Sequence, residues 1–287
     1  MDTQTNLKIA FIGAGNMALS LIKGLLASGY SANSLMATDP DESKRQSIAQ
    51  SLGISCLADN SEAVKAADIV VLAVKPQQLQ TVCLDLQSAV MASQPLIISV
   101  AAGIRSSDID RWLGNQSAIV RCMPNTPAMI QSGATGLYAN ERVSEDQKNQ
   151  AENILRAVGI TVWVKSDRDL DTVTAVSGSG PAYYFLFMEA MQAAAQGMGL
   201  NEQTARLLTI QTAFGAAKMA LESADDCATL RKNVTSPNGT TEKAIQSFEA
   251  NHLSDLVAEA MMCAKLRAEA LADELADNGS PKQIEQH

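Results

Sequence analysis

The segment FIGAGNMA, residues 11–18, constrains the fold more than any other part of this sequence. It lies between a strand-like apolar run and a helical stretch that continues to Ala27. Gly13 permits a tight turn, and Gly15 lets backbone N–H groups approach a pyrophosphate. Ala18 fills the small-residue position where helix and strand pack, and the helix N-terminus adds about half a positive charge toward the phosphates. The pattern also occurs in ordinary strand–helix turns, but the strand before it and the helix after it favour a dinucleotide-binding turn.

Short apolar runs alternate with helix-period segments through the first half of the chain, which is typical of βαβ units and a parallel sheet. The expected strands lie within residues 8–13, 34–39, 53–57, 68–74, 96–101, 118–124 and 159–164. The run at 68–74 is continuously apolar, so we expect it to be a central strand covered on both faces. From Asp169 onward, residues that favour helices dominate, and helical spacing holds almost to the end. The sequence therefore predicts an α/β domain followed by an all-helical domain.

The change of composition near Ser166–Arg168 marks the expected domain boundary. We therefore expect a dinucleotide-binding domain over residues 1–167 and a helical domain over residues 168–277. Residues 278–287 are polar and include a proline, so we expect a poorly ordered tail there.

Composition and charge exclude several classes of protein. The 287 residues carry a formal net charge of −9, which argues against a general nucleic-acid or anionic-membrane surface, because both bind through basic patches. The N-terminus lacks a positive region followed by a long apolar stretch, so we expect no export signal. The five cysteines are scattered without CxxC spacing, as in a reducing compartment, and the cytoplasm is the expected location. The most apolar segment, residues 180–199, is too polar and too short for a membrane span, and we expect a buried helix.

Asp39 ends the second expected strand, close to where an acid normally accepts hydrogen bonds from the adenine-ribose 2′-OH, which would favour NAD(H). Lys44 and Arg45 lie about one helical turn further along and could meet a 2′-phosphate. A purely structural interpretation fits equally well. In that interpretation, Asp39 caps a helix that begins at Pro40, and Glu42 completes a capping box.

Two further segments follow strand ends. Pro76 forces the chain off the sheet after a central strand, which places Lys75 near bound phosphate or nicotinamide. Two prolines around Asn125 and Thr126 make a rigid turn after another strand, with polar groups facing the same crevice. In the alternative interpretations, Lys75 is simply solvated and the second segment is only a structural turn.

The scarcity of histidine limits the chemistry. His252 and the terminal His287 are the only histidines, so neither a histidine-based dehydrogenase dyad nor a Ser-His-Asp triad has the residues it needs. A metal site of Cys and His lacks ligands at usable spacing, and we expect none. Reduction of a C=N bond fits the chain better than reduction of a carbonyl. A basic imine nitrogen can enter protonated, and it requires little beyond a cofactor, an anion-binding group and one hydroxyl.

The segment TSPNGTTEKA contains the turn residues of an anion site. Ser236 is the expected helix cap, and Pro237, with its fixed φ and missing N–H group, suits the first helical position. The N–H groups of Gly239, Thr240 and Thr241 would then lack intrahelical acceptors and could bind a carboxylate. An ordinary capped helix start is the alternative interpretation of the same residues.

Five motifs resemble those of pyrroline-5-carboxylate reductases, in the same order and over nearly the whole chain: FIGAGNMA, AVKPQ, RCMPNTPA, AVSGSGPAY and LRKNVTSPNGTTEKAIQSFE. The last motif is the most specific signature of that family. The resemblance implies a Rossmann-type doubly wound parallel sheet, followed by an all-helical dimerisation domain that intertwines with a second subunit. It also implies NAD(P)H-dependent reduction of Δ1-pyrroline-5-carboxylate to L-proline, the last step of proline biosynthesis, by a homodimer that can assemble further into a ring.

The resemblance also implies roles for particular residues. Those implied to bind the cofactor are Gly13, Ala14, Gly15, Asn16, Met17, Asp39, Asn60, Ala73, Val74, Lys75, Pro76, Ala101, Gly103 and Asn125. Those implied to hold the substrate carboxylate are Ser236, Gly239, Thr240 and Thr241. The hydroxyl of Thr241 is implied to lie close to the imine nitrogen as the catalytic group, and the helix opening at residues 177–184 to pack beside the nicotinamide.

The chain departs from the family pattern at two positions. Asn238 replaces the first glycine of a Ser-Pro-Gly-Gly sequence, and because asparagine tolerates a positive φ, we expect the turn to survive. Asp39 would repel a 2′-phosphate, whereas the family more often uses NADPH. The resemblance implies NADPH as the cofactor, and Asp39 leaves NADH as the alternative.

Two rival functions share this outline. A β-hydroxyacid dehydrogenase would place a lysine in the first C-terminal helix, but no lysine occurs between the SGSGPA motif and Lys218. A nucleotide-sensing regulator without turnover would have a damaged substrate loop, whereas Gly239 and both threonines are present. We therefore expect an NAD(P)H-dependent imine reductase that binds a small-molecule substrate and itself, and no metal, nucleic acid or membrane.

Overall fold

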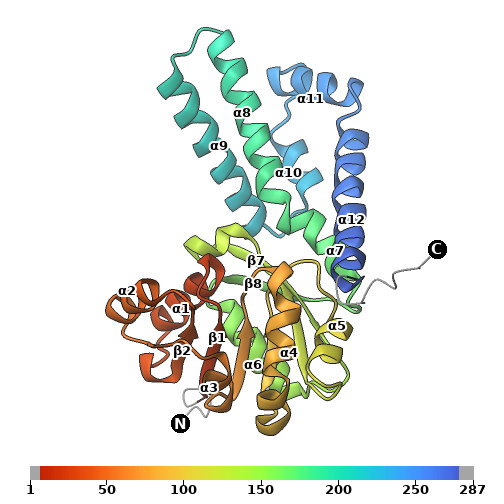
Figure 1. Ribbon diagram of the computed structural model, residues 1–287. Coiled ribbons are helices and arrows are strands. Elements are labelled where there is room, and N and C mark those ends of the chain that lie inside the picture. Colours follow the sequence, from red (N-terminus) through yellow and green to blue (C-terminus); the bar gives the residue numbers. More distant parts are fainter. Residues whose placement is uncertain (1–6, 278–287) are drawn as a thin grey trace, which may run out of the picture. The chain divides into compact units, whose positions relative to one another are not determined.

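The computed structural model describes residues 7–277, which divide into two compact units (Figure 1). The first unit combines the residues up to Ser179 with those from Ala264 onward, and the second contains residues 180–263. The expected tail, residues 278–287, lies outside the described residues.

The first unit is built on an eight-stranded sheet with the order β3-β2-β1-β4-β5-β6-β7-β8. In chain order the strands are β1 (Ile9–Ile12), β2 (Leu35–Thr38), β3 (Ser55–Leu57), β4 (Ile69–Leu72), β5 (Leu96–Ser99), β6 (Ile119–Met123), β7 (Gly133–Ala139) and β8 (Gly159–Trp163). The first six strands are parallel to one another, β7 is antiparallel to β6, and β8 is parallel to β7. The predicted Rossmann-type parallel sheet is thus confirmed for β1 to β6, and the last two strands run in the opposite direction.

The central position predicted for β4 is confirmed. This strand pairs with β1 and β5, and all of its residues are buried. The chain builds β2 and β3 on one side of β1 and then continues with β4 on the other, so the strand order reverses between β1 and β4. Ligands of doubly wound sheets bind at such a reversal, outside the carboxyl ends of the strands. The glycine turn after β1 therefore lies where a dinucleotide would bind.

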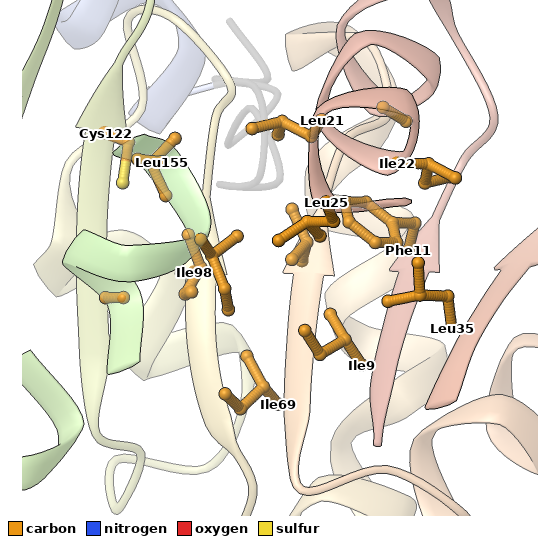
Figure 2. Packing of buried hydrophobic residues seen from close by; sticks show 14 of the residues in the cluster. Ile9, Phe11, Leu21, Ile22, Leu25, Leu35, Ile69, Ile98, Cys122 and Leu155 are labelled. Atoms are coloured by element: carbon orange, nitrogen blue, oxygen red, sulfur yellow. The ribbon is translucent and has the colours of Figure 1, made fainter. Parts of the chain in front are cut away.

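Helices cover both faces of this sheet, and an apolar core lies between the sheet and the helices on each face. The helical elements of the first unit up to Ser179 are α1 (Asn16–Ala27), η2 (Ala32–Ser34), α2 (Glu42–Leu52), α3 (Asn60–Lys65), α4 (Pro76–Ser93), α5 (Ser106–Trp112), η3 (Thr126–Ile130), α6 (Glu145–Arg156), α7 (Asp169–Val173) and the π-helical turn η4 (Thr174–Gly178). One core joins a sheet face to α1 and α6, where Leu21 and Leu25 of α1 lie near Phe11 of β1 (Figure 2). The other core joins the opposite face to α3, α4 and α5.

Strand β7 is not apparent from the sequence pattern, because GATGLYA contains two glycines and glycine is depleted in strands. Packing explains one of them. A Cβ on Gly136 would lie 2.7 Å from Cγ1 of Val173 in α7, so this strand position accepts only glycine. The close approach of α7 to β7 therefore depends on a residue that weakens the strand signal.

The predicted helical character of the C-terminal part is confirmed. Its helices are α8 (Gly180–Gly197), α9 (Glu202–Glu222), α10 (Cys227–Asn233), α11 (Thr240–Ala250) and α12 (Leu253–Asp277). The prediction that α8 is buried is wrong for the single chain, because Tyr184, Phe185 and Leu186 are 69%, 66% and 67% exposed. None of the helices within residues 7–277 combines the length and the apolar character needed to cross a bilayer.

The expected boundary at Ser166–Arg168 lies earlier in the chain than the division between the two compact units, which falls between Ser179 and Gly180. Helix α7 and the turn η4 belong to the first unit, and α12 returns to that unit at Ala264. The reason lies in the contacts of this segment. Asp167 and Asp171 both bind arginines of the first unit.

Candidate active site

The turn after β1 is shaped by Gly13. Its φ is +93°, and its N–H group donates a hydrogen bond to Oγ1 of Thr38 at the end of β2, 3.2 Å away. A Cβ at this position would lie 2.9 Å from Cγ1 of Val74 and 3.0 Å from the carbonyl oxygen of Ala73. Both the backbone conformation and the packing require glycine here, so the fold alone explains Gly13.

Gly15 has no such structural requirement. Its φ is −72°, which any residue can adopt, and the nearest atom to an added Cβ is the carbonyl oxygen of Ala73 at 3.9 Å. Gly15 and Asn16 are exposed, whereas Ala14 between the two glycines is buried. Since packing does not explain this glycine, the missing side chain leaves the backbone open to a ligand.

The N-terminus of α1 provides donors beside Gly15. The first hydrogen bond of the helix runs from the N–H group of Leu19 to the carbonyl oxygen of Gly15 at 2.9 Å. The N–H groups of Asn16, Met17 and Ala18 come before it and have no intrahelical acceptor. Such N–H groups, together with the helix dipole, attract phosphate. The geometry therefore fits a pyrophosphate.

The other predicted cofactor residues of the first unit follow β2, β3, β4, β5 and β6. They are Asp39 after β2, Asn60 after β3, Ala73, Val74, Lys75 and Pro76 after β4, Ala101 and Gly103 after β5, and Asn125 after β6. Lys75 is exposed and directly precedes α4, whose first residue is Pro76. Because these strands are parallel, their carboxyl ends meet at one edge of the sheet. The structure therefore brings these residues to the edge where Gly13 and Gly15 lie.

The side chain of Asn125 links three segments at this edge. Its Oδ1 accepts a hydrogen bond from the N–H group of Ala134 in β7 at 2.9 Å, and its Nδ2 donates to the carbonyl oxygen of Ser177 in η4 at 3.0 Å. The amide thereby holds the π-helical turn against the end of β6. This turn contains the first four residues of the AVSGSGPAY motif. Single π-helical turns occur frequently at functional sites. We interpret Asn125 as a residue that positions this turn.

Asp39 does not cap a helix, so the capping interpretation of this residue is wrong. Asp41 is the N-cap of α2, because its side chain reaches the N–H group of Lys44 at 3.2 Å, which is the donor that a cap must satisfy. The carboxylate of Asp39 instead accepts from the N–H group of Asp41 at 3.1 Å and from Nζ of Lys44. Arg45 also contacts this residue, since its Nη1 donates to the carbonyl oxygen of Asp39 at 2.9 Å.

A buried charged cluster, which none of the motifs reveals, lies near the carboxyl ends of β5 and β6. Arg121 in β6 is 2% exposed, and its Nη1 donates to Oδ1 of Asp167. Oδ2 of Asp167 accepts from the N–H group and the Oγ of Ser106 at 2.7 Å and 2.8 Å. Arg105 donates through Nη2 to Asp171 at 2.6 Å. The sequence signal for the cluster is an arginine inside the apolar strand AIVRCMP, since a buried arginine requires an acidic partner.

In the second unit, the SPNG sequence forms a tight turn before α11, whose N-cap is Gly239. The N–H group of Gly239 donates to the carbonyl oxygen of Ser236 at 3.0 Å, and Asn238 between them has a φ of +60°. A proline at the second position and a positive φ at the third are typical of a type II turn. The prediction that Ser236 caps the helix and Pro237 opens it is wrong, because both belong to this turn. The prediction that asparagine supports the turn is confirmed.

The N-terminus of α11 retains free donors beside the turn. The first hydrogen bond of the helix runs from the N–H group of Lys243 to the carbonyl oxygen of Gly239 at 3.3 Å, so the N–H groups of Thr240, Thr241 and Glu242 have no intrahelical acceptor. The N–H group of Gly239 is not free, because the turn uses it. A Cβ on Gly239 would lie 2.9 Å from the carbonyl oxygen of Ser236, so the turn needs this glycine. The arrangement can bind a carboxylate through two N–H groups.

The described residues offer few other reactive groups. Burial raises the pKa of Cys83 to about 12 and also raises that of Cys122, so both thiols stay neutral at physiological pH. His252 is exposed and lies 3.5 Å from the carboxylate of Asp255. Within residues 7–277, no group of three or more His, Cys, Asp or Glu side chains could hold a metal ion.

Comparison with known proteins gives a consistent likeness over both parts of the chain. The family model of pyrroline-5-carboxylate reductase dimerisation matches residues 167–271, and the model of coenzyme F420-dependent NADP oxidoreductases matches residues 8–103. The chain is 52% identical to the pyrroline-5-carboxylate reductase of Pseudomonas aeruginosa, over 93% of this chain and 98% of that protein. It is 34% identical to pyrroline-5-carboxylate reductase 1 of Bacillus subtilis, over 96% of this chain and 92% of that protein.

Solved structures agree with these sequence relationships. A pyrroline-5-carboxylate reductase from Coxiella burnetii is similar with a TM-score of 0.91 and 47% identity, over 93% of this chain and 99% of that one. The pyrroline carboxylate reductase of Plasmodium falciparum, solved with NADP bound, is similar with a TM-score of 0.81 and 28% identity, again over 93% and 99% of the two chains. The likeness therefore includes the glycine turn of the first unit and the SPNGTT loop of the second.

Proposed function

The chain belongs to the pyrroline-5-carboxylate reductase family, and on that premise we propose that it reduces the C=N bond of Δ1-pyrroline-5-carboxylate to L-proline with NAD(P)H. This reaction is the last step of proline biosynthesis. The observation that carries the proposal is that the likeness extends over nearly the whole chain, so that it covers both the dinucleotide turn and the substrate loop.

The cofactor would be held at the carboxyl edge of the sheet. The pyrophosphate would lie on Gly13–Met17, and the exposed Gly15, which packing does not require, supports this role. Asn60 would contact the adenosine end, and the segments after β4 and β5 would lie beside the ribose and nicotinamide. When bound, NAD(P)H would supply the hydride that reduces the carbon of the C=N bond.

The substrate carboxylate would bind at the start of α11. The N–H groups of Thr240 and Thr241 would donate to it, while Ser236 and Gly239 close the turn that presents them. The hydroxyl of Thr241 would lie close to the imine nitrogen. Because this nitrogen is basic, one hydroxyl is sufficient to orient it, and a histidine is not needed.

Self-association is supported by the second unit. Large apolar side chains of α8 and α9 are exposed in the single chain, including Phe185, Leu207 and Phe214. Exposed apolar surface of this extent marks an interaction site. We propose that residues 168–277 form the substrate-binding and dimerisation domain of a cytoplasmic homodimer, which can assemble further into a ring. No nucleic-acid, membrane or metal partner forms part of the proposal.

The decisive experiment measures NADPH and NADH oxidation by the purified full chain. We expect turnover with Δ1-pyrroline-5-carboxylate and little or none with a panel of small hydroxyacids and their oxo forms. Turnover of an oxo acid but not of the imine would replace the proposal with that of a hydroxyacid dehydrogenase. Tight cofactor binding without turnover of any substrate would point to a nucleotide-sensing protein.

A further inference from the structure

Two cations lie beside Asp39, the residue that directly follows β2. Nζ of Lys44 pairs with Oδ2 of Asp39, and Nη1 of Arg45 donates to the carbonyl oxygens of Asp39 and Pro40, both at 2.9 Å. A lone carboxylate at this position would accept the ribose 2′-OH and repel a 2′-phosphate. Here the same carboxylate is already paired with a positive charge.

The position of this group relative to the glycine turn makes it relevant to the cofactor. Thr38, the last residue of β2, pairs with Ile12 of β1, and its Oγ1 accepts a hydrogen bond from the N–H group of Gly13. Asp39 is therefore one residue beyond a strand end that contacts the proposed pyrophosphate turn. In dinucleotide-binding folds, the 2′ position of the adenine ribose lies beside the residue at this place.

We propose that Lys44 is a specificity-determining residue that lets one site accept both forms of the cofactor. With a 2′-phosphate, Lys44 leaves Asp39 and pairs with the phosphate, and the charges of Lys44 and Arg45 together offset the repulsion between the phosphate and the carboxylate. With a free 2′-OH, Lys44 stays on Asp39, and the remaining acceptor capacity of the carboxylate receives the hydroxyl. The inference rests on the proposed binding of a nicotinamide dinucleotide at this edge.

The relative strength of the two ion pairs favours this exchange. The side chain of Lys44 is 40% exposed, and ion pairs of partly exposed lysines change an equilibrium by no more than about fivefold. A 2′-phosphate carries about −1.5 to −2 charges at neutral pH, more than a single carboxylate, so it attracts the ammonium group more strongly. The flexible four-carbon stem of lysine allows the ammonium group to move between the two acceptors.

The other groups at the site stay in place while Lys44 moves. The N–H group of Asp41 holds Oδ1 of Asp39 at 3.1 Å. Two carbonyl oxygens hold one end of the Arg45 guanidinium. Among the described residues, the Nε and Nη2 of Arg45 have no acceptor, which leaves donors for a phosphate oxygen. The loss of contact between Asp39 and Lys44 therefore does not dismantle the site.

Binding of cofactor fragments tests this inference without requiring the imine reaction. Calorimetric titration of the full chain with adenosine 2′,5′-bisphosphate and with adenosine 5′-monophosphate compares ligands that differ only in the 2′-phosphate. We expect Lys44→Met to weaken binding of the 2′-phosphorylated fragment about tenfold or more, since a hydrogen bond to a charge is lost, and to leave binding of the monophosphate nearly unchanged. Lys44→Arg should restore most of the lost affinity.

A matched control removes the same charge elsewhere. Lys23 is exposed on α1 of the same unit, and Lys23→Met should change neither affinity by more than about twofold. Asp39→Asn keeps an acceptor for the N–H group of Asp41 and should shift selectivity toward the 2′-phosphorylated fragment. Equal effects of Lys44→Met on both fragments, or no effect on either, would overturn the inference. Failure of imine turnover in the wild-type chain would leave these titrations unaffected and would count against the proposed function alone.

Discussion

Nη1 of Arg121 in β6 donates both to the Oδ1 atom of Asp167 and to its carbonyl oxygen, the latter at 3.1 Å. The two side chains are only 2% and 16% exposed, so water screens their charges weakly. Asp167 also accepts from Ser106 at the start of α5. One carboxylate therefore fixes the segment that leads into α7 and the turn η4 to β6 and to the start of α5.

We expect Asp167→Asn to lower the free energy of unfolding by about 3 kcal/mol, because removing one partner of a buried ion pair leaves the other charge uncompensated. A carboxamide has a single oxygen acceptor and cannot serve both Arg121 and Ser106. Urea denaturation at one fixed protein concentration measures the loss.

Glu222→Gln provides the control for this change. Glu222 pairs with Lys218 at 3.7 Å, and both side chains are more than half exposed, so the variant should unfold at nearly the same urea concentration as the wild type. Equal stability of Asp167→Asn and Glu222→Gln would show that the buried pair does not hold the segment.

The two glycines of the dinucleotide turn should respond differently to a methyl group. Gly15→Ala should leave the melting temperature nearly unchanged, because the φ of −72° suits alanine and the nearest atom lies 3.9 Å from the added Cβ. Its affinity for NADPH should fall on the order of tenfold, because the methyl group keeps the pyrophosphate from the backbone donors. Calorimetry and thermal denaturation measure the two quantities.

Gly13→Ala is the structural counterpart. At a φ of +93° and with a contact of 2.9 Å to Val74, the added Cβ should destabilise the first unit by about 1–3 kcal/mol. If Gly15→Ala lost as much stability as Gly13→Ala, packing rather than cofactor binding would explain Gly15.

The turn before α11 should tolerate glycine but not a β-branched residue at position 238. Asn238 has a φ of +60°, which glycine adopts freely and valine adopts only at a cost of about 1–2 kcal/mol. We expect Asn238→Gly to keep the KM for Δ1-pyrroline-5-carboxylate within about twofold. Asn238→Val should raise that KM, because the turn that presents the threonine donors no longer closes. Steady-state kinetics of both variants measure the effect, and an unchanged KM in Asn238→Val would contradict it.

The sequence predicts this fold well where one local pattern decides the structure. The strand DIVVLAV is central because every position is apolar, and the turn FIGAGNMA is recognisable because glycine, strand and helix occur in a fixed order. β7 was not predictable in this way. A glycine is needed at position 136 because Val173 packs closely against it, and these two residues are far apart in the chain.

The same limit applies to the site. Glycine and helix signals locate the pyrophosphate turn, but they do not show that packing requires Gly13 and leaves Gly15 open. The start of α2 illustrates a second limit. Asp39 and Asp41 are both suitable caps by composition, and only the distance to the N–H group of Lys44 decides between them. The partners of Arg121 and the pairing of Lys44 depend on tertiary contacts and on side-chain geometry, which a local pattern does not specify.

The two threonines at the start of α11 should contribute differently to catalysis. Thr241→Ala keeps the backbone donor and removes the hydroxyl proposed to orient the imine nitrogen. We expect kcat/KM for Δ1-pyrroline-5-carboxylate to fall by the equivalent of about 1–3 kcal/mol, the usual effect of one lost hydrogen bond to a charged group. Thr240→Ala should have a smaller effect, because Thr240 is proposed to act through its N–H group.

Thr240 and Thr241 allow a direct comparison of two matched alanine variants. Both residues lie in the first turn of the same helix, and alanine favours helices, so neither change should prevent folding. Thr241→Ser retains a hydroxyl and should recover most of the activity lost in Thr241→Ala. The KM for NADPH should stay the same in all three variants, because the change is confined to the substrate loop. Wild-type kinetics in Thr241→Ala would remove the hydroxyl from the mechanism and leave carboxylate binding to the backbone N–H groups.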